Sequence, residues 1–102
     1  MTEFSGALSE RVRVEHWLGD PDAGAWLGAG DAWAGLVPAD HGPAVLGERR
    51  VGRPRYRATL RRRDDVGLAS RLLWRGRMLA VLRVEPDPRA PDRTILLVED
   101  RG

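Results

Sequence analysis

The sequence lacks cysteine and lysine altogether, and each absence excludes a class of chemistry. Without cysteine the chain can form no disulfide, no thiolate metal site and no cysteine nucleophile. Without lysine all 17 basic residues are arginines, so little besides Tyr56 titrates between neutral pH and the arginines. The calculated isoelectric point of about 10.3 therefore overstates the basicity of a chain whose formal net charge is +2.

Long apolar stretches are also absent. No run of about 18 apolar residues occurs, so we expect no membrane-spanning helix. Residues 1–6 lack the basic residues and following apolar stretch that are typical of a signal peptide. A length of 102 residues fits a single domain over residues 1–102, and a hydrophobic share of 42% with 31% charged residues is typical of globular proteins.

Signatures of catalysis and of cofactor or metal binding are scarce. The chain has only two histidines, and no HExxH, P-loop or GxGxxG string occurs in it. The acidic pairs Asp20/Asp22 and Asp64/Asp65 are typical of turns and lack the spacing of a calcium loop. We therefore expect no enzymatic activity, no cofactor and no metal site.

What the sequence does contain is an alternating stretch in which Arg55, Arg57, Thr59 and Arg61 occupy every second position. The apolar residues Tyr56, Ala58 and Leu60 occupy the positions between them. A period of two places these two sets on opposite faces of a β-strand. The apolar face can pack in a core, whereas the charged face can meet an acidic partner, a phosphate backbone or the chain's own carboxylates.

Further alternating stretches predict about six short strands. We expect these at residues 7–17, 31–38, 55–63, 70–74, 77–85 and 92–99. Residues 39–54 contain Pro43 and a stretch typical of a helix of about two turns. The pattern predicts a mostly β fold, a small six- to seven-stranded antiparallel barrel or sandwich with one short helix and long flexible loops.

Residues 18–30 are rich in glycine and contain the turn signal Asp20-Pro21-Asp22. We expect a flexible loop there and a flexible arm over residues 1–6, both becoming ordered on assembly. Trp17 and Trp26 lie at or in this loop and are candidates for a contact surface, where tryptophan is enriched.

The acids that flank the arginine strand can neutralise it across strands or across subunits. Together with the two tryptophans, these acids and the outward arginines are candidates for contacts between subunits. The candidate subunit-interface residues are Trp17, Trp26, Arg55, Arg57, Arg61, Asp64 and Asp65. The same arginines are compatible with phosphate contacts, which need only placed cations. Tyr56 is the only aromatic residue among them, although single-strand binders offer several stacking rings. A small nucleic-acid-binding β-barrel is therefore the alternative outside assembly proteins.

The order of several blocks along the chain resembles the head–tail connector proteins of tailed phages, in particular the head-closure or stopper family, which also occurs in gene transfer agents. The resemblance covers nearly the whole chain, and its ordered series carries more weight than any one block. The matching blocks are residues 6–14, 22–26, 31–38, 56–61, 70–77, 81–87 and 93–99.

This resemblance implies a β-barrel subunit of an oligomeric ring in the neck of a phage or phage-like particle assembled in the bacterial cytoplasm. Such a ring joins the portal or adaptor protein on the head side to the tail terminator or tail tube protein, and helps to retain DNA. The resemblance also places segment 39–54 towards the central channel, which makes Arg49, Arg50 and Arg53 candidates for non-specific contact with DNA. A tail terminator or another neck protein is the nearest alternative, and no membrane partner is implied.

Overall fold

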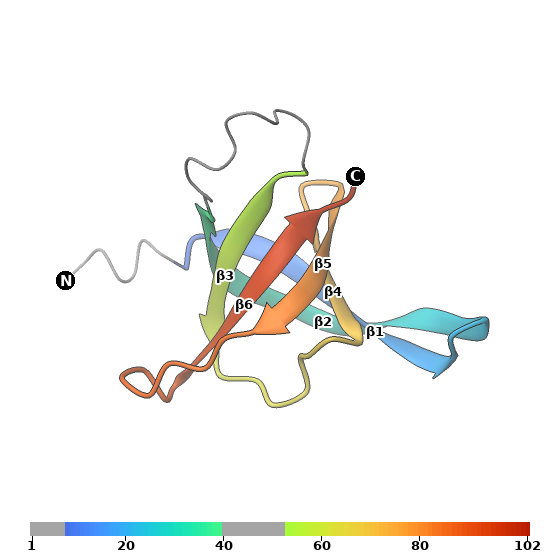
Figure 1. The fold of residues 1–102 in the computed structure, drawn as a ribbon, viewed down its shortest axis with the longest axis horizontal. Coiled ribbons are helices and arrows are strands. Elements are labelled where there is room, and N and C mark those ends of the chain that lie inside the picture. Colours follow the sequence, from blue (N-terminus) through green and yellow to red (C-terminus); the bar gives the residue numbers. More distant parts are fainter. Residues whose placement is uncertain (1–7, 40–52) are drawn as a thin grey trace.

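The alternation of apolar and polar residues builds a closed antiparallel β-barrel (Figure 1). The computed structural model describes residues 8–39 and 53–102. Its strands are β1 (Glu10–Asp20), β2 (Ala23–Pro38), β3 (Arg55–Arg61), β4 (Ser70–Trp74), β5 (Arg77–Val84) and β6 (Arg93–Asp100). Their order around the barrel is β1-β2-β3-β6-β5-β4, and β4 closes the ring by pairing with β1. The predicted mostly β barrel is thereby confirmed.

The core is formed by the inward positions of the strands. In β3 these are Ala58 and Leu60, while Arg55, Arg57 and Arg61 point outward, as the two-residue period predicts. The side chains that are at most 1% exposed come from all six strands: Val12, Val14, Ala34, Ala58, Leu60, Leu72, Leu79, Leu96 and Val98. Closure of the sheet pairs the strands of the barrel on both sides, which removes free edges there.

Residues 18–30 form strand and turn rather than an irregular loop, so the predicted flexible loop is wrong. β1 and β2 pair from Glu15 opposite Gly28 to Asp20 opposite Ala23, with the turn at residues 21 and 22. The pairing of β1 with β4 ends at His16, and that of β2 with β3 ends at Ala34. The two strands therefore continue past the barrel as a projecting hairpin (Figure 1).

The remaining strands lie within two residues of their predicted positions. The tight turn between β4 and β5 uses Arg75 and Gly76, whose φ angles of +53° and +80° are those of a two-residue hairpin turn. The expected arm over residues 1–6 and the core of the expected helix lie outside the described residues, as do Arg49 and Arg50.

Candidate functional site

The outward arginines of β3 are largely neutralised by carboxylates of the same chain. Arg55 donates from Nε to Glu99 at 3.2 Å, because the register of β3 and β6 places these residues opposite each other. Arg57 donates from Nε to Glu85 at 2.7 Å, and Arg83 shares the same carboxylate at 2.7 Å. The hydrogen bonds from Arg57 and Arg83 hold the pKa of Glu85 below its usual value. The charged face of β3 could meet an acidic partner, a phosphate backbone or the chain's own carboxylates. In the structure it meets the chain's own carboxylates.

The ion pairs extend to most of the arginines. Within residues 8–39 and 53–102, only Arg53, Arg61 and Arg89 lack an ion pair. Arg53 is exposed just before β3; the hydrogen bond from Arg77 is the main reason that the pKa of Asp100 is lowered, and the charge of Arg53 adds a small part. Arg61, at the end of β3, is therefore the arginine of this strand whose charge stays available to a partner.

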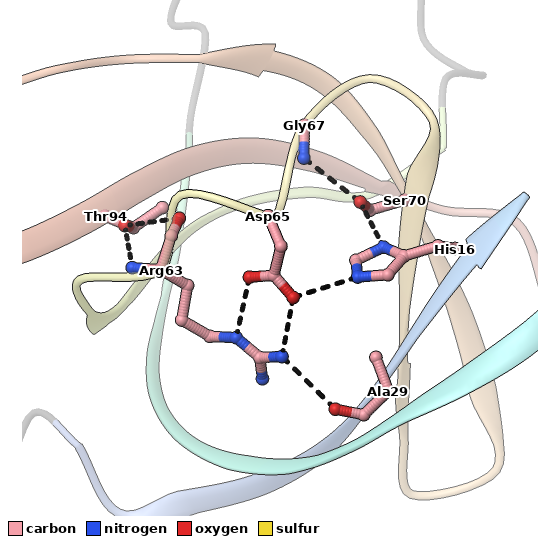
Figure 2. A network of polar contacts seen from close by, with 7 residues as sticks. All are labelled: His16, Ala29, Arg63, Asp65, Gly67, Ser70 and Thr94. Carbon is pink, nitrogen blue, oxygen red and sulfur yellow. Dashed lines mark hydrogen bonds and ion pairs between the residues drawn. The ribbon is translucent and has the colours of Figure 1, made fainter.

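Asp64 and Asp65, the acids that follow β3, both pair with arginines of their own loop. Asp64 accepts a hydrogen bond from Arg62 at 3.1 Å on the surface. Asp65 accepts two from Arg63, one to each carboxylate oxygen, at 3.1 and 2.9 Å (Figure 2). The role of these two acids between subunits stays a prediction.

Asp65 also belongs to a network that ties the β3–β4 loop to the base of the hairpin (Figure 2). Its carboxylate lies 3.0 Å from Nε2 of His16, whose Nδ1 lies 2.9 Å from Oγ of Ser70. Arg63 donates from Nη2 to the carbonyl of Ala29 at 3.2 Å, which adds β2 to the network. The loop is thus attached to β1, β2 and β4 by side chains from three places in the sequence.

An aspartate, a histidine and a serine in one hydrogen-bonded line resemble a hydrolytic triad. Ser70, however, is only 4% exposed, and its Oγ accepts the backbone N–H of Gly67 at 3.0 Å. The hydroxyl therefore closes a loop turn instead of facing a substrate. Sequence inspection missed the network because His16 is 49 and 54 residues away from its two partners.

The Asp65 network predicts a loss of stability in acid. The Arg63 hydrogen bond is the main reason that the pKa of Asp65 falls from 3.8 to about 2. A depressed carboxyl pKa contributes stability that is fully present above pH 4 and is lost as the pH falls towards 2. Because the side chain is 47% exposed, solvent screening reduces this contribution to about 1 kcal/mol.

The variant Asp65→Asn should therefore be about 1 kcal/mol less stable than the parent at pH 7, measured by urea unfolding. The difference should vanish between pH 4 and pH 2, where the parent carboxylate becomes protonated. Asp64→Asn is the matched control, since that carboxylate is 82% exposed and pairs only with Arg62. A stability difference for Asp65→Asn that stays constant down to pH 2 would contradict this account.

Trp17 and Trp26, the predicted contact tryptophans, meet on one face of the hairpin. Their rings lie edge to face, with centroids 5.3 Å apart and planes at 71°. The guanidinium of Arg71 lies 4.2 Å from the centroid of the Trp26 ring and is held by Glu15 at 2.7 Å. Both tryptophans are partly buried, so they stiffen the hairpin as well as offering surface.

Among the described residues, no group of three or more His, Asp or Glu side chains is arranged to hold a metal ion. The same ranges contain no helix of the length and hydropathy needed to span a bilayer.

Comparisons with known proteins give a fold likeness. No protein-family model matches the sequence, and no curated protein matches it. Among solved structures, protein SF1141 from Shigella flexneri 2a superposes with a TM-score of 0.71 at 22% identity, covering 95% of this chain and 96% of that one. A chain of the virion of a native gene transfer agent particle superposes with a TM-score of 0.71 at 15% identity, covering 91% of this chain and 94% of that one. These likenesses show a shared fold over almost the whole length of each chain.

Proposed function

We propose that this chain is a structural protein of a tailed phage or phage-like particle, and specifically a head–tail connector of the head-closure type. The observation that carries the proposal is the end-to-end likeness to a chain of a gene transfer agent virion. That match covers 91% of this chain and 94% of the other. The ordered sequence blocks that resemble connector proteins support the same function independently.

The charge distribution also favours a mechanical role over recognition of nucleic acid. Most arginines of the described ranges are engaged by carboxylates, which leaves a small electrostatic footprint for a phosphate backbone. In the proposed role the rigid barrel is a building block of a ring between the portal or adaptor and the tail. Retention of DNA then follows from closing the head, with Arg53 as the described candidate for weak contact in the channel.

The test is deletion of the gene for this chain from the genome that encodes it, followed by electron microscopy of the particles. We expect heads without attached tails and a loss of packaged DNA, both restored by supplying the chain in trans. Normal tailed particles in the deletion strain would overturn the proposal. Heads carrying tails of irregular length would instead assign the chain to the tail-terminator position.

Binding measurements on the free chain distinguish the connector from the alternative function, a nucleic-acid-binding barrel. Retardation of DNA by the free chain, decreasing steeply with salt, would favour a nucleic-acid-binding barrel. Binding only to portal–adaptor complexes would favour the connector.

A further inference from the structure

The hairpin carries the apolar face of the barrel core past the end of the barrel. Val12 and Val14 of β1 are fully buried, and the same face continues through His16 to Leu18. Leu27 lies opposite His16 on this face. Towards the tip this face is open to solvent, since Leu18 is 62% exposed and Leu27 48% exposed. Because a two-stranded hairpin is marginally stable alone in water, an uncovered apolar face on one indicates a contact surface.

The tip of this hairpin is acidic. Asp20 ends β1 and Asp22 lies in the turn, and both are exposed. Neither carboxylate forms a hydrogen bond or ion pair with any residue in the described ranges. The arm therefore combines an apolar face with uncompensated negative charge at its end.

The outer wall of the barrel offers the complementary surface. Trp33 and Val37 point outward from β2 and are 53% and 59% exposed. Ala34 of β2 is paired with Leu60 of β3, and both side chains are buried. Trp33 precedes Ala34 and Arg61 follows Leu60, so both point outward on the same wall. Arg61 supplies the positive charge that no described carboxylate neutralises. This wall is apolar and basic where the hairpin is apolar and acidic.

We propose that the hairpin of one copy of this chain packs on the outer wall of a second copy. Leu18 and Leu27 cover Trp33 and Val37, and the acidic tip approaches Arg61. The hairpin projects away from β3 of its own barrel, so one molecule cannot satisfy both surfaces itself (Figure 1). The two surfaces differ, which makes the contact heterologous, and a heterologous contact repeated around an axis closes a ring. The inference rests on the proposed function, in which the chain forms such a ring.

The absence of cysteine makes disulfide cross-linking a clean test. The variants Leu27→Cys and Val37→Cys are each introduced into the full chain, at exposed positions on the hairpin and on the wall. Mixed and oxidised, the two chains should form a disulfide-linked heterodimer, and a chain with both substitutions should form a ladder. Each single variant alone should stay largely uncross-linked. Efficient self-linking of Leu27→Cys would show hairpin-to-hairpin pairing and overturn the proposal.

Charge reversal tests the polarity of the contact. Arg61→Glu in the Val37→Cys chain should lower the heterodimer yield roughly tenfold or more, because like charges then face each other. Combining it with Asp20→Arg and Asp22→Arg in the Leu27→Cys chain should restore the yield. Arg89→Glu is the matched control, since Arg89 is exposed and lacks an ion pair in the described ranges. Equal losses from Arg61→Glu and Arg89→Glu would overturn the specific contact.

The same cysteine chains, expressed in place of the parent, separate this inference from the proposed function. Their presence in purified particles, detected by mass spectrometry, reports on the function, and cross-linking within those particles reports on the contact. Particles that contain both chains without the 27–37 disulfide overturn the contact and leave the function standing. Chains absent from particles refute the function, and the cross-linking in solution then decides the contact alone.

Discussion

Replacing Leu72 by alanine should lower the free energy of unfolding by about 2–5 kcal/mol. Leu72 in β4 is 0% exposed and lies in register with Val14 of β1 and Leu79 of β5, which are equally buried. The substitution removes transfer energy and leaves a cavity that a closed barrel cannot collapse around, because each strand is held by neighbours on both sides. Total stabilities of domains are about 5–15 kcal/mol, so this loss is a large fraction of the whole.

The control for Leu72→Ala is the same substitution at Leu68, which is 70% exposed in the β3–β4 loop. We expect a change within about 0.5 kcal/mol there, because little apolar surface leaves the core. Both values are measured by urea unfolding of the full chain, with the slope of the transition compared to confirm that the unfolded state is unchanged. Similar effects at the two positions would contradict the assignment of the barrel interior as the source of stability.

The barrel itself was predictable from the sequence because most of its strands carry a two-residue period of apolar and polar residues. Tyr56, Ala58 and Leu60 alternate with arginines, and the structure places them on the side of the barrel that the pattern indicates. β6 is apolar on both faces in the sequence, and in the structure it pairs with β3 on one side and β5 on the other. In such segments local periodicity and burial agree, so strand positions were predicted to within a few residues.

The hairpin was not predictable in this way, because its composition indicates a loop. Its strands are held by contacts that a local reading does not contain. Trp17 packs against Trp26, and Arg71 from β4 covers the Trp26 ring. The glycines that count against regular structure let the two strands and the indole rings approach closely. Tertiary packing thus overrode local propensity.

The sequence predicted only part of the candidate site, because the site also depends on contacts between residues that are far apart in the sequence. The sequence showed a charged strand and two unusual tryptophans, and the structure brings the tryptophans together and pairs Arg55 and Arg57 with Glu99 and Glu85. Which of several acids neutralises each arginine depends on the register of β6 with β3 and with β5, which alternation alone does not determine. Joining His16 to Asp65 and Ser70 likewise requires the fold. Long-range pairing is the information that composition and spacing lack.

The variant Gly24→Ala should open the hairpin while leaving the barrel folded. A Cβ atom at Gly24 would lie 2.5 Å from the carbonyl oxygen of Leu18 and 2.7 Å from the Trp17 ring. Relief of these overlaps must shift backbone, which is rigid, so we expect the local opening free energy to fall by about 1–3 kcal/mol. Amide hydrogen exchange should show the loss in residues 17–26, with little change in β5 and β6.

Gly28→Ala is the matched control within the same strand. A Cβ atom at Gly28 meets only the guanidinium end of Arg13, at 2.5 Å from Nη2, and this flexible side chain can move aside. We expect that variant to keep both its exchange protection and the circular dichroism signal of the coupled Trp17 and Trp26 rings, whereas Gly24→Ala loses both. If alanine is tolerated equally at the two positions, the close packing of Trp17 over Gly24 does not hold the hairpin together. The projecting arm, and the contact built on it, would then need another source of rigidity.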